Sequence, residues 1–218
     1  MIEQAKGMSH PILTVGHSTR TTNEFIELLR EHEIKRLVDV RTIPRSRYNP
    51  QFNRDELSKS LGRALIGYTH MPELGGLRHA RKDSTNTGWR NLSFRGFADY
   101  MQTAEFEQGL QRLIEMSARE PIAIMCAEAV PWRCHRSLIA DALVTRGIPA
   151  VDIISAGHAQ PHKMTPFAHV EDGRVTYPGE EALSLWGGSD FALQDPDPGD
   201  KLDRRRRDVA ARAGRHPR

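Results

Sequence analysis

The stretch from Cys126 to Arg136 gathers residue types that could act chemically on an anion. It follows the most apolar run of the chain, at 122–125, and precedes a helical apolar pattern, so we expect a strand-to-helix turn. The N–H groups that begin a helix lack internal partners, and the helix dipole is positive there, which favours a phosphate or carboxylate. Arg133 and Arg136 would reinforce that field. The same field would lower the pKa of the Cys126 thiol and make it a candidate nucleophile, with Glu128 beside it as an acid or base.

Cys126 and Cys134 are the only cysteines in the chain. Two cysteines are too few for a disulfide framework, and an intracellular compartment would keep them reduced, so we expect no disulfide between them. Both could instead be small buried packing residues. Six residues separate Cys126 from Arg133, one more than in the phosphate loop of cysteine phosphatases, so we do not assign that mechanism.

The histidines and cysteines have no ordinary zinc-binding spacing, because the sequence contains no Cys-x-x-Cys pair and adjacent Cys134 and His135 point poorly at one ion. We therefore predict no metal and no other cofactor. A zinc site remains the less favoured alternative, and it would draw on Cys126, Cys134, His135, His158 and His162.

A second group of polar residues lies at 39–52. Arginine forks bind phosphate through two hydrogen bonds, and the rings of Tyr48 and Phe52 could stack on bases, so this segment suits a nucleotide or a nucleic-acid backbone. Asp39 is either a carboxylate for acid–base chemistry or the salt-bridge partner of Arg41 that holds the loop, and both interpretations stay open. The candidates for phosphate binding in this segment are Arg41, Arg45 and Ser46.

Strand-like and helix-like segments alternate along the chain, a pattern typical of a parallel sheet covered by helices. The expected strands are 12–15, 37–40, 68–71, 122–125 and 150–154. The expected helices are one capped by Thr22, 55–65, 105–119 and one from Pro131 to Gly147, with a long loop at 75–94. We predict a single Rossmann-like three-layer α/β domain over 10–180, with a mostly parallel sheet of about five strands and strand 122–125 near its centre.

Polar or glycine residues follow each of the five expected strands: Gly16 to Ser18, Arg41 to Tyr48, Glu73 to Gly76, Cys126 to Glu128 and Gly157 to His158. Ligands of open α/β sheets bind beyond the carboxyl ends of the strands, so we expect these residues to converge on one pocket. The candidate catalytic residues are Cys126, Glu128, Asp39 and His17. The candidate binding residues are Gly16, Ser18, Arg41, Arg45, Ser46, Arg133, Cys134, His135 and Arg136. The alternative for His17 and His70 is a hydrogen-bonded structural role.

Charge is unevenly distributed over the 218 residues, whose net charge is +3. Residues 41–95 carry a net +7 and residues 201–218 a net +6, so we expect a basic face and a basic end. We read 187–218 as a linker and a disordered basic tail, because it has no apolar periodicity. The chain shows neither an apolar run of roughly 18 residues nor a secretory signal, so we expect a soluble cytoplasmic protein that does not enter a membrane.

Taken together, these motifs resemble the family called domain of unknown function 488 over about residues 12–178. The resemblance rests on the stretches at Thr14 to Ser18, Asp39 to Arg41, Pro44 to Ser46, Glu73 to Gly76, Cys126 to Glu128 and Cys134 to Arg136. It implies a compact prokaryotic α/β domain with its characteristic polar residues at the strand ends. It implies no particular reaction.

The function that we expect is an enzyme acting on a phosphate-bearing substrate, a nucleotide or a nucleic acid. The alternative is a non-catalytic nucleic-acid-binding protein that uses the basic zone at 41–95 and the basic tail. A third alternative, thiol redox sensing, requires a depressed pKa at Cys126. The expected partner is therefore an anionic small molecule or a nucleic acid, and the sequence assigns no oligomeric state.

Overall fold

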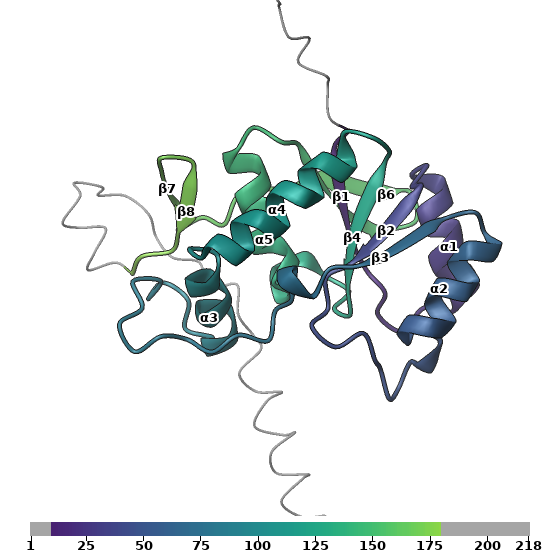
Figure 1. Ribbon diagram of the computed structural model, residues 1–218, viewed down its shortest axis with the longest axis horizontal. Helices are drawn as coiled ribbons and strands as arrows, with labels where there is room; N and C mark the ends of the chain where they lie inside the picture. Colours follow the sequence, from purple (N-terminus) through teal and green to yellow (C-terminus); the bar gives the residue numbers. More distant parts are fainter. Residues whose placement is uncertain (1–9, 180–218) are drawn as a thin grey trace, which may run out of the picture.

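The computed structural model describes residues 10–179 and shows a six-stranded sheet between two helical layers (Figure 1). The strands are β1 (Ile12–Gly16), β2 (Arg36–Asp39), β3 (Gly67–His70), β4 (Ile122–Cys126), β5 (Ala150–Ser155) and β6 (His158–Pro161). Their order in the sheet is β3-β2-β4-β1-β5-β6. The first five strands are parallel and β6 pairs antiparallel at the edge, so the predicted α/β class with a mostly parallel sheet is confirmed.

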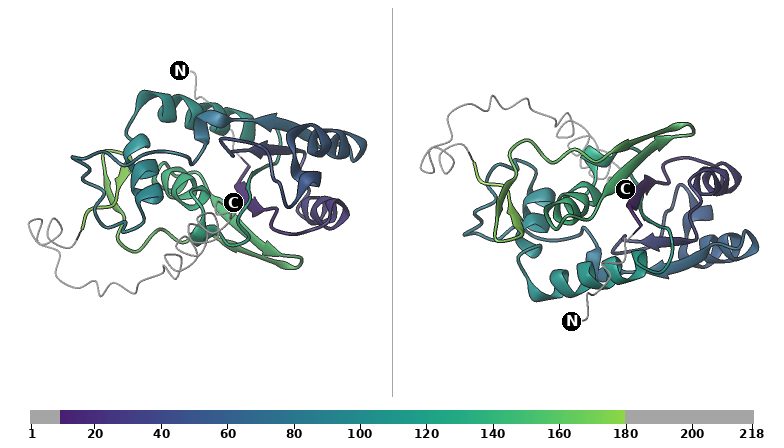
Figure 2. Two further views of the ribbon diagram at one scale, coloured as in Figure 1. Left: turned by 90° about the horizontal axis from the view of Figure 1, so that it is seen from below. Right: turned by 90° about the horizontal axis from the view of Figure 1, so that it is seen from above.

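The helices are α1 (Thr22–Glu31), α2 (Arg54–Arg63), α3 (Leu92–Tyr100), α4 (Ala104–Ser117) and α5 (Arg136–Thr145). Three short 3-10 turns are η1 (Pro50–Phe52), η2 (Pro72–Leu74) and η3 (Pro131–Arg133), and β7 (His169–Glu171) forms a hairpin with β8 (Arg174–Thr176). Figure 2 shows α1 and α2, in purple and blue, on one side of the strands and α3 to α5, in teal and green, on the other. The layers are therefore those of a three-layer sandwich.

Alternate residues of the strands build two separate apolar cores. In β1, Leu13 and Val15 pack with α1 and α2, whereas Ile12 packs with the core formed by α3, α4 and α5. The same alternation holds in β4, where Met125 faces the first core and Ile124 the second. Because every residue of β1 and β4 is buried, both strands lie in the middle of the sheet, as predicted for 122–125.

Local signals set the start of α1. Thr21 accepts a hydrogen bond from the Glu24 N–H, and the Glu24 carboxylate accepts one from the Thr21 N–H, which forms a capping box. The predicted cap, Thr22, is wrong by one residue, because Thr22 already has a place inside the helix. The buried residues Phe25 and Leu29 place the apolar face of α1 against the sheet.

The largest error of the sequence prediction concerns the segment after β4. We expected a helix to open at Pro131, whereas Pro131 begins the short turn η3, and Cys134 then takes an extended conformation with φ −139° and ψ 142°. The helix α5 begins only at Arg136. The N–H groups of Ser137 and Leu138, in the first turn of α5, bond to the carbonyls of Cys134 and His135. These groups are therefore taken by the chain itself, which removes the basis for an anion site on them.

A buried network of polar side chains connects α5 with β5. His162 lies between two carboxylates, with Nε2 2.9 Å from Asp141 and Nδ1 2.8 Å from Asp152. Thr14 donates to Asp152 at 2.6 Å and Tyr177 donates to Asp141 at 2.8 Å. Burial alone would lower the pKa of His162, but its hydrogen bonds to the two carboxylates and their charges raise it to about 9. His162 is therefore a protonated partner of both carboxylates at neutral pH.

This network predicts a loss of stability in mild alkali. Since the pKa of His162 is raised from 6.5 to about 9 in the folded protein, its contribution is fully present below pH 6.5 and is lost as the pH rises through 9. The expected decrease in the free energy of unfolding is about 3 kcal/mol between those limits. Urea unfolding of the wild type and of His162→Gln, measured from pH 6 to 10, checks this. The decrease of the unfolding free energy with pH should become smaller in His162→Gln. It should persist in the control His158→Gln, because His158 is exposed. An equal pH dependence in all three proteins would contradict the prediction.

The predicted linker and basic tail at 187–218 lie outside the described residues. Within 10–179, no helix has the length and apolar character needed to cross a bilayer. The same part of the chain contains no group of three His, Cys, Asp or Glu side chains placed to hold a metal ion.

Candidate functional site

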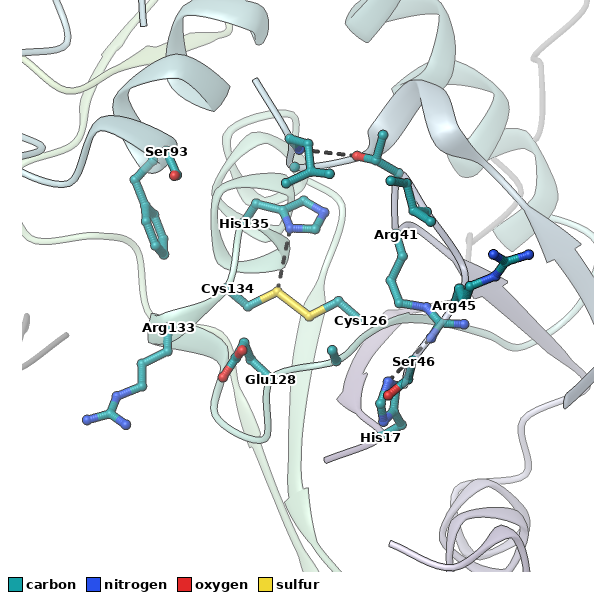
Figure 3. Close-up of a pocket in the computed structure, with 16 residues that line it drawn as sticks. His17, Arg41, Arg45, Ser46, Ser93, Cys126, Glu128, Arg133, Cys134 and His135 are labelled. Carbon is teal, nitrogen blue, oxygen red and sulfur yellow. Dashed lines mark hydrogen bonds between the residues drawn. A yellow bond between two sulfur atoms is a disulfide. The ribbon is translucent and has the colours of Figure 1, made fainter. Parts of the chain in front are cut away.

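A cavity of about 600 Å³ lies where β1, β2 and β4 end. The residues that line it are His17, Arg41, Thr42, Ile43, Arg45, Ser46, Gly76, Leu77, Ser93, Phe94, Cys126, Ala127, Glu128, Arg133, Cys134 and His135. Nine of the predicted site residues are among them. Four predicted residues, Asp39, Gly16, Ser18 and Arg136, do not line the cavity. Figure 3 shows His17 and Arg41 on one side of the two cysteines and Arg133 and Ser93 on the other.

The cavity occupies the point where the direction of the chain crossovers reverses. The helix that follows β1 packs in one layer, whereas the helix that follows the neighbouring strand β4 packs in the opposite layer. The loops leaving these two strands therefore diverge and leave a crevice between them. His17 follows β1 and Cys126 ends β4, so sequence order and sheet order together bring them to one place. The fifth predicted strand end, Gly157 to His158, comprises the turn residue Gly157 and the first residue of β6, and neither residue lines the cavity.

Cys126 and Cys134 are joined by a disulfide at the floor of the cavity. The expectation that the two cysteines stay unpaired is therefore wrong for this structure. The physical reason is the path of the chain, because η3 turns the segment back so that Cys134 lies against the end of β4. Both cysteines are buried, at 3% and 5% exposure, and they also contact the apolar core of α5.

Arg136 lies beneath this disulfide and is completely buried. Its Nη1 donates to the Cys126 sulfur at 2.9 Å and to the Glu128 carbonyl at 2.6 Å, and its Nη2 donates to the Ala129 carbonyl at 2.9 Å. Its Nε has no hydrogen-bond partner among the described residues. Burial lowers the pKa of Arg136 to about 10, so it keeps its charge at neutral pH. Arg136 thus stabilises the 126–129 loop through these hydrogen bonds and does not line the cavity.

Arg41 is held in place by Asp39, whose side chain is inaccessible to solvent. The carboxylate of Asp39 accepts hydrogen bonds from Arg41 Nε at 2.8 Å and Nη2 at 2.6 Å, and from the Tyr68 hydroxyl at 2.7 Å. A further bond from Arg41 Nη2 reaches the Phe52 carbonyl. These contacts favour the salt-bridge interpretation of Asp39 over acid–base chemistry. Of the five Arg41 donors, one Nη1 hydrogen has no partner within 10–179 and is free for a ligand.

His17 lines the cavity as an uncharged side chain. Its Nδ1 lies 2.8 Å from the Ser18 carbonyl, which can only accept, so Nδ1 carries the hydrogen and Nε2 faces Arg41 Nη1 at 3.4 Å as an acceptor. Burial, together with the charge of Arg41, lowers the pKa of His17 to about 4. The ring stacks on Phe52 at 4.2 Å. Phe52 is therefore in the core, and its predicted stacking on bases is wrong, whereas His70 has the structural role that we gave as its alternative, with Nε2 bonded to the Arg41 carbonyl.

His135 lies beside the second sulfur. Its Nε2 is 3.1 Å from the Val40 carbonyl, and its Nδ1 is 3.6 Å from the Cys134 sulfur. Burial, with smaller effects from the charges of Arg136 and Arg78, lowers the pKa of His135 to about 4, so this ring is neutral as well. A side chain at Gly76 would overlap this ring, so the missing Cβ at Gly76 lets His135 pack there.

The rim of the cavity carries exposed charged and apolar side chains. Arg45, Glu128 and Arg133 are exposed, and in Figure 3 the guanidinium groups of Arg45 and Arg133 extend away from the sulfur atoms. Ser46 stabilises the loop through bonds involving Asn53 and Asn49. The apolar part of the rim consists of Ile43, Leu77 and Phe94. Sequence reasoning missed Leu77, Phe94 and Ser93, because it read 75–94 as a loop and did not find α3. It also did not single out Ile43 in the segment 39–52.

Gly16 and Ser18 shape the cavity without lining it. The Ser18 N–H donates to the Ala127 carbonyl, and Ser18 has a left-handed φ of 51°, which costs free energy in a residue other than glycine. A side chain at Gly16 would overlap the backbone carbonyl of Glu128. The absence of a Cβ at Gly16 therefore lets the 126–129 loop cross the end of β1.

Gly16→Ala should lower the free energy of unfolding by about 1–3 kcal/mol, because the backbone of the 126–129 loop must move to admit the methyl group. Urea denaturation measures the change. Gly62→Ala is the matched control, since nothing lies within 4 Å of a Cβ at Gly62 in α2, and it should raise stability by about 0.5–1 kcal/mol. Equal stability of Gly16→Ala and the wild type would show that the loop does not cross there.

A comparison with known protein families matches residues 21–143 to the family described as Domain of unknown function DUF488. The chain belongs to this family. The matched segment contains Asp39 to Arg41 and Cys126 to Arg136, and it begins after His17. Comparisons of the chain with curated proteins and with solved structures gave no match. The DUF488 segment thus contains all of the cavity-lining residues except His17.

Proposed function

We propose that this DUF488 protein is an enzyme that acts on a phosphate-bearing substrate, a nucleotide or a nucleic acid, in the cavity at the ends of β1, β2 and β4. The observation that carries the proposal is that one cavity is lined both by a cysteine sulfur and by three arginines. Arg41, Arg45 and Arg133 line it, and Glu128 is the one acidic residue among the described residues that do. Such an excess of positive charge suits an anionic group, because arginine binds phosphate oxygens through charge-assisted hydrogen bonds.

The size and polarity of the cavity support a nucleotide over a free phosphate ion. Small-molecule sites have volumes of roughly 300–1,000 Å³, and the cavity of about 600 Å³ lies in the middle of that range. The apolar side chains of Ile43, Leu77 and Phe94, which line the same cavity as Arg41, offer a surface for a base. We assign phosphate binding to the arginines and base contact to this apolar rim.

The proposed chemistry begins with the reduced form of Cys126. Its thiolate is the nucleophile at the cavity floor, and Glu128 at the exposed edge is the acid or base that serves the leaving group or the attacking water. His17 and His135 are neutral at physiological pH, so they act as hydrogen-bonding groups and not as cations. Arg136 stabilises negative charge on Cys126 from below.

The test is a binding and turnover panel with reduced protein, using inorganic phosphate, the ribonucleoside and deoxyribonucleoside mono-, di- and triphosphates, and a single-stranded DNA 20-mer. We expect calorimetry to show binding of one or more nucleotides and chromatography to show its conversion. The double variant Arg45→Gln with Arg133→Gln should weaken binding on the order of 100-fold or more, as charged hydrogen bonds contribute about 1.5–3 kcal/mol each. Arg112→Gln, which alters an exposed arginine paired with Glu73, is the control. Absence of binding and conversion across the whole panel would refute the proposal.

A non-catalytic nucleic-acid-binding protein is the second candidate, and two exposed aromatic rings favour it. Tyr48 is 87% exposed and Trp132 is 50% exposed, on the two loops that carry Arg45 and Arg133. Exposed rings among arginines are typical of single-strand binding surfaces. This candidate predicts affinity for the 20-mer that falls steeply with salt and is the same in Cys126→Ser, with no conversion of any nucleotide.

A further inference from the structure

We infer that Cys126 and Cys134 form an asymmetric thiol–disulfide exchange pair, in which Cys126 is the thiolate that attacks and Cys134 is the thiol that closes the disulfide. The co-reactant is a small-molecule disulfide. The cysteines are joined in the structure, and both line the cavity through which a small reagent would arrive. The inference concerns the oxidation state of the proposed nucleophile, and it holds whether or not the substrate bears phosphate.

The first argument is the charge of Arg136. A fully buried arginine normally has an anionic partner, because an isolated buried charge is costly. Within residues 10–179, Arg136 forms no ion pair with a carboxylate, and its three hydrogen bonds go to two carbonyls and the Cys126 sulfur. In the reduced protein this sulfur, 2.9 Å from Nη1, is the bonded group able to take a negative charge. Arg136 therefore favours the thiolate of Cys126.

Other charged groups near Arg136 do not replace Cys126 as its partner. Asp152 is the strongest of them, but its carboxylate is bonded to His162 and Thr14. The Glu128 side chain is exposed at the cavity edge, and Arg20 adds a like charge. The direct contact with sulfur thus distinguishes Cys126 from these groups.

The second argument is the neutral environment of Cys134. The Val40 carbonyl can only accept a hydrogen bond, so Nε2 of His135 carries the hydrogen and Nδ1 presents a lone pair to the Cys134 sulfur at 3.6 Å. Because the ring is neutral, it accepts the S–H hydrogen of Cys134 and supplies no positive charge. Cys134 therefore stays protonated where Cys126 is ionised, which makes the pair asymmetric.

The reaction proceeds in two balanced steps. The Cys126 thiolate attacks one sulfur of a small-molecule disulfide, forms a mixed disulfide and releases one thiolate. The Cys134 sulfur then attacks the Cys126 sulfur of that mixed disulfide, and the second small-molecule sulfur leaves with the proton of Cys134 as a thiol. Two electrons pass from the cysteine pair to the small-molecule disulfide. The product is the disulfide seen in the structure, and in it Cys126 is no longer a nucleophile.

The first test measures thiol ionisation in reduced protein. Thiolate absorbance at 240 nm is titrated in Cys134→Ser and in Cys126→Ser, and wild-type protein is alkylated with iodoacetamide and mapped by mass spectrometry. We expect the midpoint for Cys126 to lie about one pH unit or more below that for Cys134. At pH 6, Cys126 should be alkylated several-fold faster than Cys134, since its larger thiolate fraction outweighs its lower intrinsic reactivity. Equal midpoints, or a lower midpoint for Cys134, would overturn the inference.

The second test follows exchange with glutathione disulfide. Wild-type protein should lose two hydrogens without retaining glutathione, Cys134→Ser should accumulate one glutathione on Cys126, and Cys126→Ser should react at least several-fold more slowly. Similar rates for the two serine variants would overturn the inference. Arg136→Gln should raise the Cys126 midpoint, whereas Arg146→Gln, beyond the other end of α5, should leave it unchanged. If Arg136→Gln does not fold, as judged by circular dichroism, the measurements on the wild type and the serine variants decide.

The two proposals fail separately. Asymmetric exchange without binding of any nucleotide would refute the proposed function and leave the exchange pair standing. Turnover that depends on Cys126, combined with equal thiol midpoints, would leave the proposed function standing and refute the exchange pair.

Discussion

Asp39→Ala should lower the free energy of unfolding by about 3–5 kcal/mol, the largest effect on stability that we expect from a single side chain near the cavity. The substitution removes the carboxylate that pairs with Arg41 and accepts the Tyr68 hydroxyl. Arg41 is itself only 7% exposed, so its charge would remain in a poorly solvated place without a partner. Chemical denaturation of the two proteins at pH 7 measures the difference.

The pair formed by Arg81 and Asp83 is a matched control for this prediction. It has the same separation of two residues between an aspartate and an arginine, and a similar distance of 2.8 Å, but it lies in solvent. Exposed ion pairs contribute little, so Asp83→Ala should leave stability unchanged within the error of the measurement. A loss of less than about 1 kcal/mol in Asp39→Ala would mean that the Asp39–Arg41 pair does not hold the loop between β2 and α2.

Cys126→Ser should reduce turnover of the nucleotide identified in the panel on the order of 10³-fold or more, because a serine hydroxyl is not ionised beside Arg136. Binding should change little, since the arginines that hold phosphate remain. The measurement is kcat and KM under reducing conditions, where the expected loss is confined to kcat.

One further variant and one oxidised form of the wild type make this result specific. Cys134→Ser should retain turnover within about tenfold under reducing conditions, because Cys134 is the second cysteine of the pair and not the nucleophile. Wild-type protein oxidised to the disulfide should be as inactive as Cys126→Ser and should recover on reduction. Full turnover in Cys126→Ser would remove Cys126 from the mechanism and leave Glu128 as the candidate for the chemistry.

The strands that position the cavity were predictable because they are short, mostly apolar runs between polar segments. β1, β2 and β4 begin and end within one residue of the expected bounds. A run of four or five buried residues between polar segments is typical of a buried strand. Parallel strands then place their carboxyl ends at one edge of the sheet. The convergence of His17, Arg41 and Cys126 follows from these two facts.

The short connections were harder to predict, because weak local signals compete there. Proline is common at the first position of a helix, which favoured a helix from Pro131, yet three residues later the extended conformation of Cys134 ends the turn. The helix α3 was not predicted, because it lies in a segment rich in polar residues. The signals for it were the Asn91 cap and the spacing of Phe94, Phe97 and Ala98. The Asp172–Gly173 turn between β7 and β8 was likewise a readable hairpin signal.

The roles of the charged residues depended on partners distant in sequence. Arg136 was expected to face an anion in solution, but it lies under the loop and contacts Cys126, because the helix begins five residues later than predicted. Phe52 was expected to meet a base, but it stacks on His17. The spacing of residues along the chain predicts the edge of the sheet at which a residue lies. The direction in which its side chain points depends on the path of the loop, which the spacing does not specify.

The most direct measurement is a crystal structure of the reduced protein with the nucleotide that binds most tightly in the panel. We predict that a phosphate oxygen of the nucleotide accepts a hydrogen bond from Arg41 Nη1, that the base lies against Ile43, Leu77 and Phe94, and that the Cys126 sulfur faces the phosphate. A nucleotide bound elsewhere on the protein, with the cavity at the ends of β1, β2 and β4 empty of it, would contradict the account.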